Sequence, residues 1–316
     1  MAGTIPKEKA KIQRPLPDRP FDVVGFGENS VDLIGVIDSW PEPDTKRTLS
    51  AFDRMPGGQI ATATVAAARL GCRTRYVGVF GDDDEGRWLV ATLGAHDVDV
   101  TAIVRQGAAT RRAVILVEQS TGARAVLENR DAHLTLLPRD LPLDILTSGR
   151  VLMLDATDVD ASIAAASAAR EAGIPVVLDV DRRTDRLERL LATTDVLVTS
   201  KSFPADYTGE RDLETALRRL ADAGPWLIAA TPGPEGSVAL HEGEFVRTPA
   251  LQVGAVDTTG AGDAFRAGLV AAWVRAQPSP ELATLLRTAN VVAGLSCLGR
   301  GAQGGLPNWQ EVSQWV

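Results

Sequence analysis

The residues of this chain that point most directly to chemistry lie between positions 254 and 266, which read Gly-Ala-Val-Asp-Thr-Thr-Gly-Ala-Gly-Asp-Ala-Phe-Arg. Gly260 and Gly262 predict a tight turn that opens a helix, and the free N–H groups of a helix's first turn attract anions. The N–H groups of Gly260, Ala261 and Gly262 are therefore candidates for binding a phosphate. We predict phosphoryl transfer in which Asp263 accepts a proton from the attacking hydroxyl. The alternative is that Asp257 and Asp263 only cap and stabilise the helix.

These residues lie where a predicted strand end, residues 253–256, meets a helix that apolar residues at helical spacing predict over 261–274. Elsewhere short apolar runs alternate with helical stretches. This alternation predicts an α/β fold with a doubly wound, mostly parallel sheet flanked by helices. In such sheets ligands bind at the carboxyl ends of the strands, where Asp179 and the Gly260 turn are expected to converge. The predicted strands include residues 22–27, 150–154, 175–179, 195–198 and 226–230.

Two segments interrupt the alternation and predict a small second sheet. One spans residues 31–52, and the other spans residues 113–128. The second holds two apolar runs on either side of Ser120-Thr121-Gly122, which is typical of a β-hairpin. We expect the two segments to form a β-sheet lid.

Two motifs resemble the signatures of a known family. Asp257-Thr-Thr-Gly-Ala-Gly-Asp263, followed by Ala-Phe, resembles the C-terminal signature of the ribokinase-like, or PfkB, family of carbohydrate kinases. Gly57-Gly58-Gln59, which leads into an alanine-rich helix ending at Gly71, resembles the N-terminal signature of the same family. The resemblance covers about residues 21–307. It implies one ribokinase-like kinase domain over residues 21–316, whose lid closes on the sugar and excludes water before transfer.

The resemblance also implies which residues bind the sugar. Asp32 matches the aspartate that holds substrate hydroxyls in the family, with Asn29 beside it, and Arg266 is a candidate for reading an anionic group because its helix begins at the anion site. Thr62 departs from the common pattern, in which an asparagine binds the sugar; sulfofructose kinases are similar in having threonine there. The expected substrate-binding residues are Asp32, Asn29, Gly57, Gly58, Gln59, Thr62 and Arg266.

For the nucleotide, the resemblance implies ATP carrying Mg²⁺. Ser200 and Phe203 stand where many relatives have Asn-x-x-Glu in a magnesium and phosphate network, and the ketohexokinase branch departs there too, with a pair like Ser200-Lys201. Asp257 matches a position at which many relatives bind a monovalent cation, usually K⁺. The expected nucleotide-binding residues are Thr231, Gly233, Gly236, Thr259 and Asn290.

The composition of the chain limits the classes of partner and the cellular location that we expect. With 316 residues, 45% of them hydrophobic, the chain can bury a large core, and its net charge of −8 argues against nucleic acid or an anionic membrane as the main partner. Two distant cysteines, Cys72 and Cys297, match no metal spacing and suit a reducing cytoplasm. Residues 1–20 have no apolar core of a signal peptide and predict a flexible tail.

The sequence therefore predicts a cytoplasmic, ATP-dependent kinase that transfers the γ-phosphoryl group to a hydroxyl of a small carbohydrate. The substrate is left open between a ketohexose-like sugar and an anionic sugar, with a nucleoside as a further candidate. A sugar-binding regulator without catalysis is the alternative from another class. A homodimer formed through an exposed edge of the lid is a further expectation.

Overall fold

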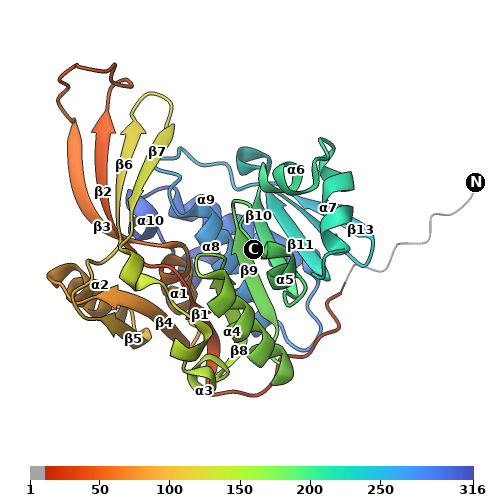
Figure 1. Cartoon of the computed structure of the whole chain (residues 1–316). Helices are drawn as coiled ribbons and strands as arrows, with labels where there is room; N and C mark the ends of the chain where they lie inside the picture. The colour runs from red at the N-terminus through yellow and green to blue at the C-terminus, as the bar shows by residue number, and fades with distance from the viewer. Residues whose placement is uncertain (1–10) are drawn as a thin grey trace, which may run out of the picture.

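A computed structural model describes residues 11–316 of the chain, and its elements follow the expected alternation of strands and helices (Figure 1). The strands are β1 (Phe21–Phe26), β2 (Ser30–Ile37), β3 (Ala51–Gly57), β4 (Thr74–Gly81), β5 (Asp99–Arg105), β6 (Arg112–Glu118), β7 (Arg124–Asn129), β8 (Gly149–Asp155), β9 (Val176–Val180), β10 (Val196–Ser200), β11 (Leu227–Thr231), β12 (Ser237–His241) and β13 (Glu244–Thr248). The helices are α1 (Gln59–Arg69), α2 (Asp84–Gly94), α3 (Leu143–Leu146), α4 (Val159–Glu171), α5 (Leu187–Leu191), α6 (Phe203–Thr208), α7 (Leu213–Ala221), α8 (Ala261–Arg275), α9 (Leu282–Ser296), α10 (Gly301–Gly304) and α11 (Trp309–Val312). Within residues 11–316, no helix is long and apolar enough to cross a membrane.

The main sheet confirms the predicted fold class. Among the described residues nine strands pair in the order β13-β12-β11-β10-β9-β8-β1-β4-β5. All pairs are parallel except those of β12, which is antiparallel to both of its neighbours. The chain builds outward from β1 on one side and then returns to place β8 on its other side, so the direction of winding switches between β1 and β8. Ligands of doubly wound sheets bind at such a switch point, beyond the carboxyl ends of the strands.

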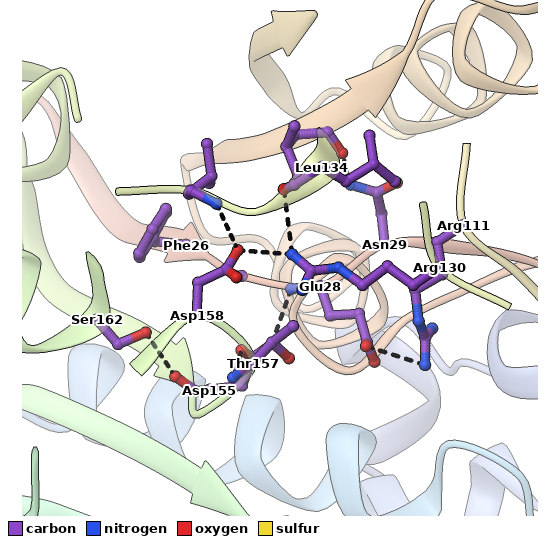
Figure 2. Close-up of a pocket in the computed structure, with 13 residues that line it drawn as sticks. Phe26, Glu28, Asn29, Arg111, Arg130, Leu134, Asp155, Thr157, Asp158 and Ser162 are labelled. Atoms are coloured by element: carbon purple, nitrogen blue, oxygen red, sulfur yellow. Dashed lines mark hydrogen bonds and ion pairs between the residues drawn. The ribbon is translucent and has the colours of Figure 1, made fainter. Parts of the chain in front are cut away.

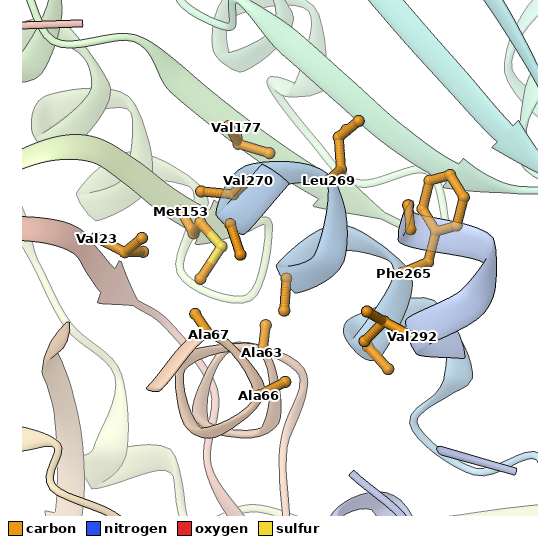
Figure 3. Packing of buried hydrophobic residues seen from close by; sticks show 14 of the residues in the cluster. Val23, Ala63, Ala66, Ala67, Met153, Val177, Phe265, Leu269, Val270 and Val292 are labelled. Atoms are coloured by element: carbon orange, nitrogen blue, oxygen red, sulfur yellow. The ribbon is translucent and has the colours of Figure 1, made fainter. Parts of the chain in front are cut away.

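Each face of the main sheet packs against its own set of helices because neighbouring residues of a strand point to opposite faces. Val23 and Met153 pack with α1, α8 and α9 in one buried cluster, whereas Val24 and Leu152 pack with α4, α5 and α7 in another. Figure 3 shows α8 beside α1 on this face of the sheet, with Val270 of α8 directed at the strands. Helix α8 is apolar on almost every side, which suits a helix enclosed by the core.

The predicted β lid corresponds to a second sheet of β3-β2-β6-β7, which stands apart from the main sheet at one end of the molecule (Figure 1). Strands β2 and β6 are parallel, and β3 and β7 pair antiparallel at the two edges. Its inner face has a small core made by Ile34, Ala113, Ile115 and Val117. Met55 of β3 packs beside this core and lies against Gly301 of α10, where an added Cβ would be 2.3 Å from its sulfur. The inner face of the small sheet is therefore held against the main domain.

The structure differs from the sequence-based prediction just before α8. Residues 253–256 do not form a strand. A strand requires a neighbour with which its backbone can pair, and here the N–H of Val256 donates instead to the carbonyl of Cys297, at 2.8 Å. The approach to α8 is therefore an irregular segment fastened to the end of α9.

The predicted flexible tail over residues 1–20 is wrong where the structure describes it, from residue 11 onward. Ile12 has no exposed surface and belongs to the main core, and its N–H donates to the carbonyl of Pro280, at 2.9 Å. The N–H of Leu16 donates to Oε1 of Gln277, at 3.0 Å. Leu16 also packs against the main core, and Arg14 lies over the ring of Trp226, so several contacts hold this segment. The rest of the predicted tail, residues 1–10, lies outside the described residues.

Candidate active site

A cleft of about 300 Å³ lies between the carboxyl ends of the main-sheet strands and the inner face of the small sheet. Its floor includes Asp179 of β9, Ser200 of β10 and Thr231 of β11, and its roof includes Ala113 and Ile115 of β6. The N-terminus of α8 closes one side. The cleft thus occupies the region in which the strand ends and the glycine turn were expected to meet.

The glycine turn has the conformation that its sequence predicts. Gly260, the N-cap of α8, has φ of 77°, a left-handed conformation in which a side chain is strained. An added Cβ there would also lie 2.8 Å from the backbone of Ala302, whereas a Cβ on Gly262 would meet nothing within 4 Å. The N–H of Ala261 is turned toward the carbonyl of Thr258, at 3.3 Å. Gly260 therefore shapes the turn, and Gly262 leaves open space for an anion at the helix N-terminus.

Asp263 lies in the first turn of α8 and lines the cleft, with 13% of its side chain exposed. Burial raises its pKa well above the usual range for aspartate, and the like charges of Glu28, Asp155, Asp32 and Asp181 raise it further. A carboxylate whose pKa is shifted toward neutrality is a stronger base than an ordinary one at physiological pH. The burial and pKa of Asp263 suit proton abstraction better than they suit helix capping alone.

Asp257 braces the turn instead of facing open space. Its Oδ1 accepts from the N–H of Thr259 at 2.9 Å, and its Oδ2 accepts from the N–H of Gly301 at 2.8 Å. The hydroxyl of Thr259 behaves differently: it is buried in the cleft wall and has no hydrogen-bond partner within residues 11–316. An unpaired buried hydroxyl beside a helix N-terminus is what a bound oxygen-rich group would satisfy.

At the opposite side of the cleft, Asp32 at the start of β2 has only 5% of its surface exposed but still lines the cavity. Ser30 donates its hydroxyl to Asp32 Oδ1 at 2.6 Å, and burial raises the pKa of Asp32. Gly57 does not line the cleft; it makes room for Asp32, because an added Cβ would lie 2.0 Å from Asp32 Oδ2. Gly58 and Gln59 do line the cleft, at the beginning of α1.

Two more of the predicted sugar-binding residues, besides Gly57, do not line this cleft. The side-chain amide of Asn29 donates to the Tyr76 hydroxyl at 3.0 Å and to the carbonyl of Val79 at 2.9 Å, so it fixes the turn after β1. Thr62 has no exposed surface, and its hydroxyl lies 3.4 Å from Nε2 of Gln303. Both predictions are wrong because position after a motif does not determine which way a side chain turns in a packed core.

Arg266 is also buried completely and does not line the cleft. Its Nη1 lies 2.7 Å from Asp179 Oδ2, and its Nη2 lies 3.3 Å from Asp263 Oδ1 and 2.9 Å from the carbonyl oxygen of Gln59. Burial lowers its pKa to about 10, which leaves it a cation at neutral pH. The prediction that Arg266 binds substrate is therefore wrong: it holds the carboxylates of the cleft wall from behind.

Some of the predicted nucleotide-binding residues line the cleft and others do not. Thr231 lines the cleft at the end of β11, and Gly233 is exposed beyond it with no atom within 4 Å of an added Cβ. Gly236 is buried, and an added Cβ would lie 2.1 Å from the carbonyl oxygen of Thr248. Asn290 is wrong as a ligand, because its amide donates to Ser237 Oγ at 2.9 Å and to Thr248 Oγ1 at 2.8 Å and so ties α9 to β12 and β13.

Glu28, which follows β1, is a cleft residue that sequence reasoning did not single out. Figure 2 shows the guanidinium of Arg111 turned toward its carboxylate, at 2.9 Å. Burial raises the pKa of Glu28 to about 8, with smaller contributions from Arg111, which opposes the shift, and from Asp155. The N–H of Glu28 donates to Asp155 Oδ2 at 2.7 Å, so the ends of β1 and β8 are joined at the switch point. The sequence held a signal, because Glu28 directly follows the predicted strand 22–27 and Asp155 directly follows the predicted strand 150–154.

Arg111 also connects the two sheets. It lies just before β6 and is bonded both to Glu28 of the main domain and to Glu128 of β7, at 2.9 and 3.1 Å. Arg182, which follows β9, lies 3.7 Å from the other oxygen of Glu128. The small sheet is therefore fastened across one end of the cleft by ion pairs.

No cluster of three or more His, Cys, Asp or Glu side chains arranged to hold a metal ion occurs within residues 11–316. The position of the predicted Asn-x-x-Glu network holds Ser200, which lines the cleft, and Phe203, which is buried and stacks on Tyr207 at 5.6 Å. The carboxylates that do line the cleft, such as Asp179 and Asp181, suit a Mg²⁺ ion delivered with a nucleotide better than one held by the protein alone.

The mostly parallel sheet, the second sheet across its carboxyl end and a carboxylate at a glycine-lined helix N-terminus together define a small-molecule phosphotransferase. Comparison with known proteins agrees. Residues 21–309 match the family model described as pfkB family carbohydrate kinase. The chain belongs to this family.

Two curated relatives span most of the chain. The fructokinase of Klebsiella pneumoniae is 34% identical over 82% of this chain and 91% of its own length. The aminoimidazole riboside kinase of Salmonella typhimurium is 31% identical over 92% of this chain and 93% of its own length. The solved structure of Arabidopsis thaliana ribokinase complexed with ribose and ATP has the same fold, with a TM-score of 0.79 and 24% identity over 93% of this chain and 98% of that one. These matches confirm the predicted family and class of enzyme, and their substrates differ from one another.

Proposed function

We propose that this carbohydrate kinase transfers the γ-phosphoryl group of ATP to a hydroxyl of a small sugar, with Asp263 as general base. The observation that carries the proposal is Asp263 itself: a carboxylate with a raised pKa that faces the cleft from the first turn of α8. The sugar hydroxyl attacks phosphorus, its proton passes to Asp263, and the bond between the β–γ bridging oxygen and the γ-phosphorus breaks as ADP forms.

The chain's own groups suit the two substrates at different sides of the cleft. On the α8 side, the open space at Gly262 and the unpaired hydroxyl of Thr259 fit phosphate oxygens, and Thr231 and Gly233 lead away toward the surface. Bound ATP would supply the phosphoryl group, with Mg²⁺ neutralising its charge. On the other side, Asp32 accepts hydrogen bonds and suits sugar hydroxyls.

We further propose that the sugar is uncharged. Six carboxylates line the cleft against two arginines, and they include Glu28, Asp32 and Glu128 on the side assigned to the sugar. A carboxylate or sulfonate placed among them would meet repulsion, whereas hydroxyl groups would donate hydrogen bonds to them. Arg266, the arginine predicted to read an anionic group, is buried behind the wall and does not line the cleft.

The test is ADP release from Mg-ATP with a panel of neutral ketoses and aldoses, carboxylated and sulfonated sugars, and nucleosides, measured with and without K⁺. We expect turnover with a neutral sugar and its loss in the Asp263→Asn variant. Sugar binding without ADP release from any member of the panel would favour the non-catalytic regulator. Faster turnover of an anionic sugar than of its neutral analogue would refute the substrate class.

A second copy of the chain is our proposed partner for the outer face of the small sheet. Phe52, Val114 and Leu127 lie on that face, as the strand register shows, and are 60%, 40% and 60% exposed. Such a patch on a sheet is typical of a protein interface. Sedimentation should show a homodimer that Leu127→Lys weakens, and a monomeric wild type at micromolar concentration would contradict this.

A reducing cytoplasm is the location that we propose. Cys72 and Cys297 are both unpaired thiols, and burial raises the pKa of each, which makes them poor nucleophiles. Fractionation of the native cells, with the enzyme followed by antibody, would test this location.

A further inference from the structure

A second cavity, of about 330 Å³, lies at the edge of the main sheet opposite the active-site cleft, and we call it the distal pocket. Pro175, Asp195 and Trp226 line it, and they directly precede β9, β10 and β11. The distal pocket therefore lies at the amino ends of the same strands whose carboxyl ends form the cleft floor. Residues 11–20, which we call the strap, run along this edge of the sheet and supply Arg14 to the pocket (Figure 1).

Two indole N–H groups at the distal pocket have no hydrogen-bond partner within residues 11–316. They belong to Trp226 and to Trp273 of α8, whose rings meet edge to face with their centroids 5.9 Å apart. Trp273 has only 2% of its surface exposed. A buried donor without a partner is costly to the folded state, and the acceptor oxygens of a ligand would satisfy two such donors at one cavity.

The lining of the distal pocket is positively charged, although the whole chain carries a net charge of −8. Two arginines line it, Arg14 of the strap and Arg170 in the last turn of α4, against one carboxylate, Asp195. Arg14 lies over the ring of Trp226, 4.7 Å from its centroid. Arg170 donates from Nη1 to the carbonyl of Ala192 at 2.6 Å. In the described part of the chain neither arginine pairs with a carboxylate, so both charges are open to an anion.

The shape and chemistry of the lining select among anions. The cavity is much larger than a bare phosphate or carboxylate group, and the indole rings, Ile174 and Pro175 offer apolar contact to a carbon skeleton. The two guanidinium groups come from separate elements, so a doubly charged group with several acceptor oxygens can engage both of them. A phosphate monoester has these properties, whereas a carboxylate has one charge and two oxygens.

We propose that the distal pocket binds a small phosphate monoester, and that this ligand is the sugar phosphate that the enzyme releases. The identity of the ligand rests on the proposed function, which produces such a compound. Arg14 and Arg170 bind the phosphate, and the two indole N–H groups donate to oxygens of the ligand. Because Arg14 lies over the ring of Trp226, its movement onto the phosphate exposes the indole to the ligand.

Trp273 connects the distal pocket with the active site, because it belongs to the helix that carries the proposed base. Asp263 lies in the first turn of α8, and Trp273 follows it about 15 Å further along the helix axis, at about 1.5 Å per residue. A ligand that shifts Trp273 therefore displaces Asp263 from the attacking hydroxyl, and a misplacement of about 1 Å can cost about 100-fold in rate. The product should inhibit by lowering kcat.

The first test separates this inhibition from ordinary product inhibition in the cleft. Product in the cleft competes with the substrates, whereas product in the distal pocket lowers the rate even when sugar and ATP are saturating. We expect Arg14→Ala and Arg170→Ala each to require at least about tenfold more product for the same fractional loss of kcat. Arg287→Ala is the matched control and should be inhibited like the wild type, because Arg287 is an exposed arginine of α9 that does not line the distal pocket.

The second test measures binding without turnover and so does not depend on the proposed function. Fructose 6-phosphate, glucose 6-phosphate and ribose 5-phosphate are titrated calorimetrically into protein saturated with a non-hydrolysable ATP analogue, whose γ-phosphate takes the place of a product phosphate in the cleft. We expect at least one ester to bind, with at least about tenfold lower affinity in Arg14→Ala and Arg170→Ala and unchanged affinity in Arg287→Ala. Inorganic phosphate and gluconate should bind at least tenfold more weakly than that ester.

The outcomes separate the parts of the proposal. Failure of every ester to bind, or equal affinity in the wild type and both arginine variants, would overturn the site. Inorganic phosphate or gluconate binding as tightly as the esters would overturn the ligand class. Ester binding together with product inhibition that saturating sugar and ATP abolish would overturn the feedback role. If an ester binds as expected while no sugar of the panel is phosphorylated, the proposed function fails and the distal pocket remains a phosphate monoester site.

Discussion

Replacement of Asp263 by asparagine changes one atom of the side chain and removes its ability to accept a proton. A general base contributes about 10²- to 10⁴-fold to a rate, so kcat should fall by this factor, which corresponds to about 3–5 kcal/mol in the activation free energy. Sugar affinity should be nearly unchanged, because the variant retains Asp32 across the cleft. Ser30 still donates its hydroxyl to Oδ1 of Asp32 there.

The same substitution should not destabilise the fold, and the structure gives the sign of the effect. Asp263 lies among Glu28, Asp32, Asp155 and Asp181, whose charges raise its pKa. A carboxyl whose pKa is raised on folding holds its proton in the folded state, so its contribution to stability is complete at low pH and is lost as the pH rises through the folded pKa. Asparagine has no proton to lose, so the variant should gain stability relative to the wild type as the pH rises.

Two measurements on the same preparations test this reasoning: initial rates of ADP release, and the free energy of unfolding in urea at pH 6 and pH 8. The expected pattern is a large fall in kcat with stability at pH 8 equal to or above that of the wild type. If Asp263 only capped the helix, the variant would lose about 1 kcal/mol of stability and keep most of its activity. That result would refute its role as base.

Two other predictions concern the buried charges. Arg266→Met should lower the free energy of unfolding by about 3–5 kcal/mol, because it leaves Asp179 without its buried partner; a loss below about 1 kcal/mol in urea would show that this ion pair contributes little. Glu28 has its pKa raised from 4.5 to about 8, so wild-type stability should fall with rising pH across that window, by at most about 1.4 kcal/mol per pH unit. Glu28→Gln should flatten this slope, and an unchanged slope between pH 5.5 and pH 7.5 would show that Glu28 is ionised throughout.

Much of the fold follows from the sequence because its signals are local. Alternating apolar runs and helical stretches are properties of consecutive residues, and parallel strands joined by helices pack in few ways. The prediction of a strand at 253–256 was wrong because a strand also needs a neighbouring strand with which to pair. The N–H of Val256 donates instead to the carbonyl of Cys297 at the end of α9. The prediction of a flexible tail missed the burial of Ile12, because that burial depends on a core built from distant segments.

The residues of the site also differ in whether local sequence or tertiary packing decides their placement. Asp263, Gly260 and Gly262 were predictable because a helix N-terminus is built by adjacent residues, and the conformation of Gly260 is a property of its own backbone. The orientations of Asn29 and Asn290 were not predictable, because a side-chain amide in a suitable motif can turn toward a ligand or toward the core. Hydrogen bonds to Tyr76 and Thr248, which are distant in the sequence, fix these two amides in the core.

The sequence by itself determined the family, the sheet and the placement of a carboxylate, Asp263, in the first turn of α8. Only the tertiary structure decided the charge of the cleft, because that charge depends on pairing between residues far apart in the chain. Arg266 and Arg124 differ little as residues in a sequence, yet one is enclosed beside Asp179 and the other faces the cleft from the small sheet. Coulomb interactions depend on distance in space, and Asp179, which lies 2.7 Å from Arg266, is far from it in the sequence, so packing decides which arginine is enclosed behind the cleft wall and which lines the cleft.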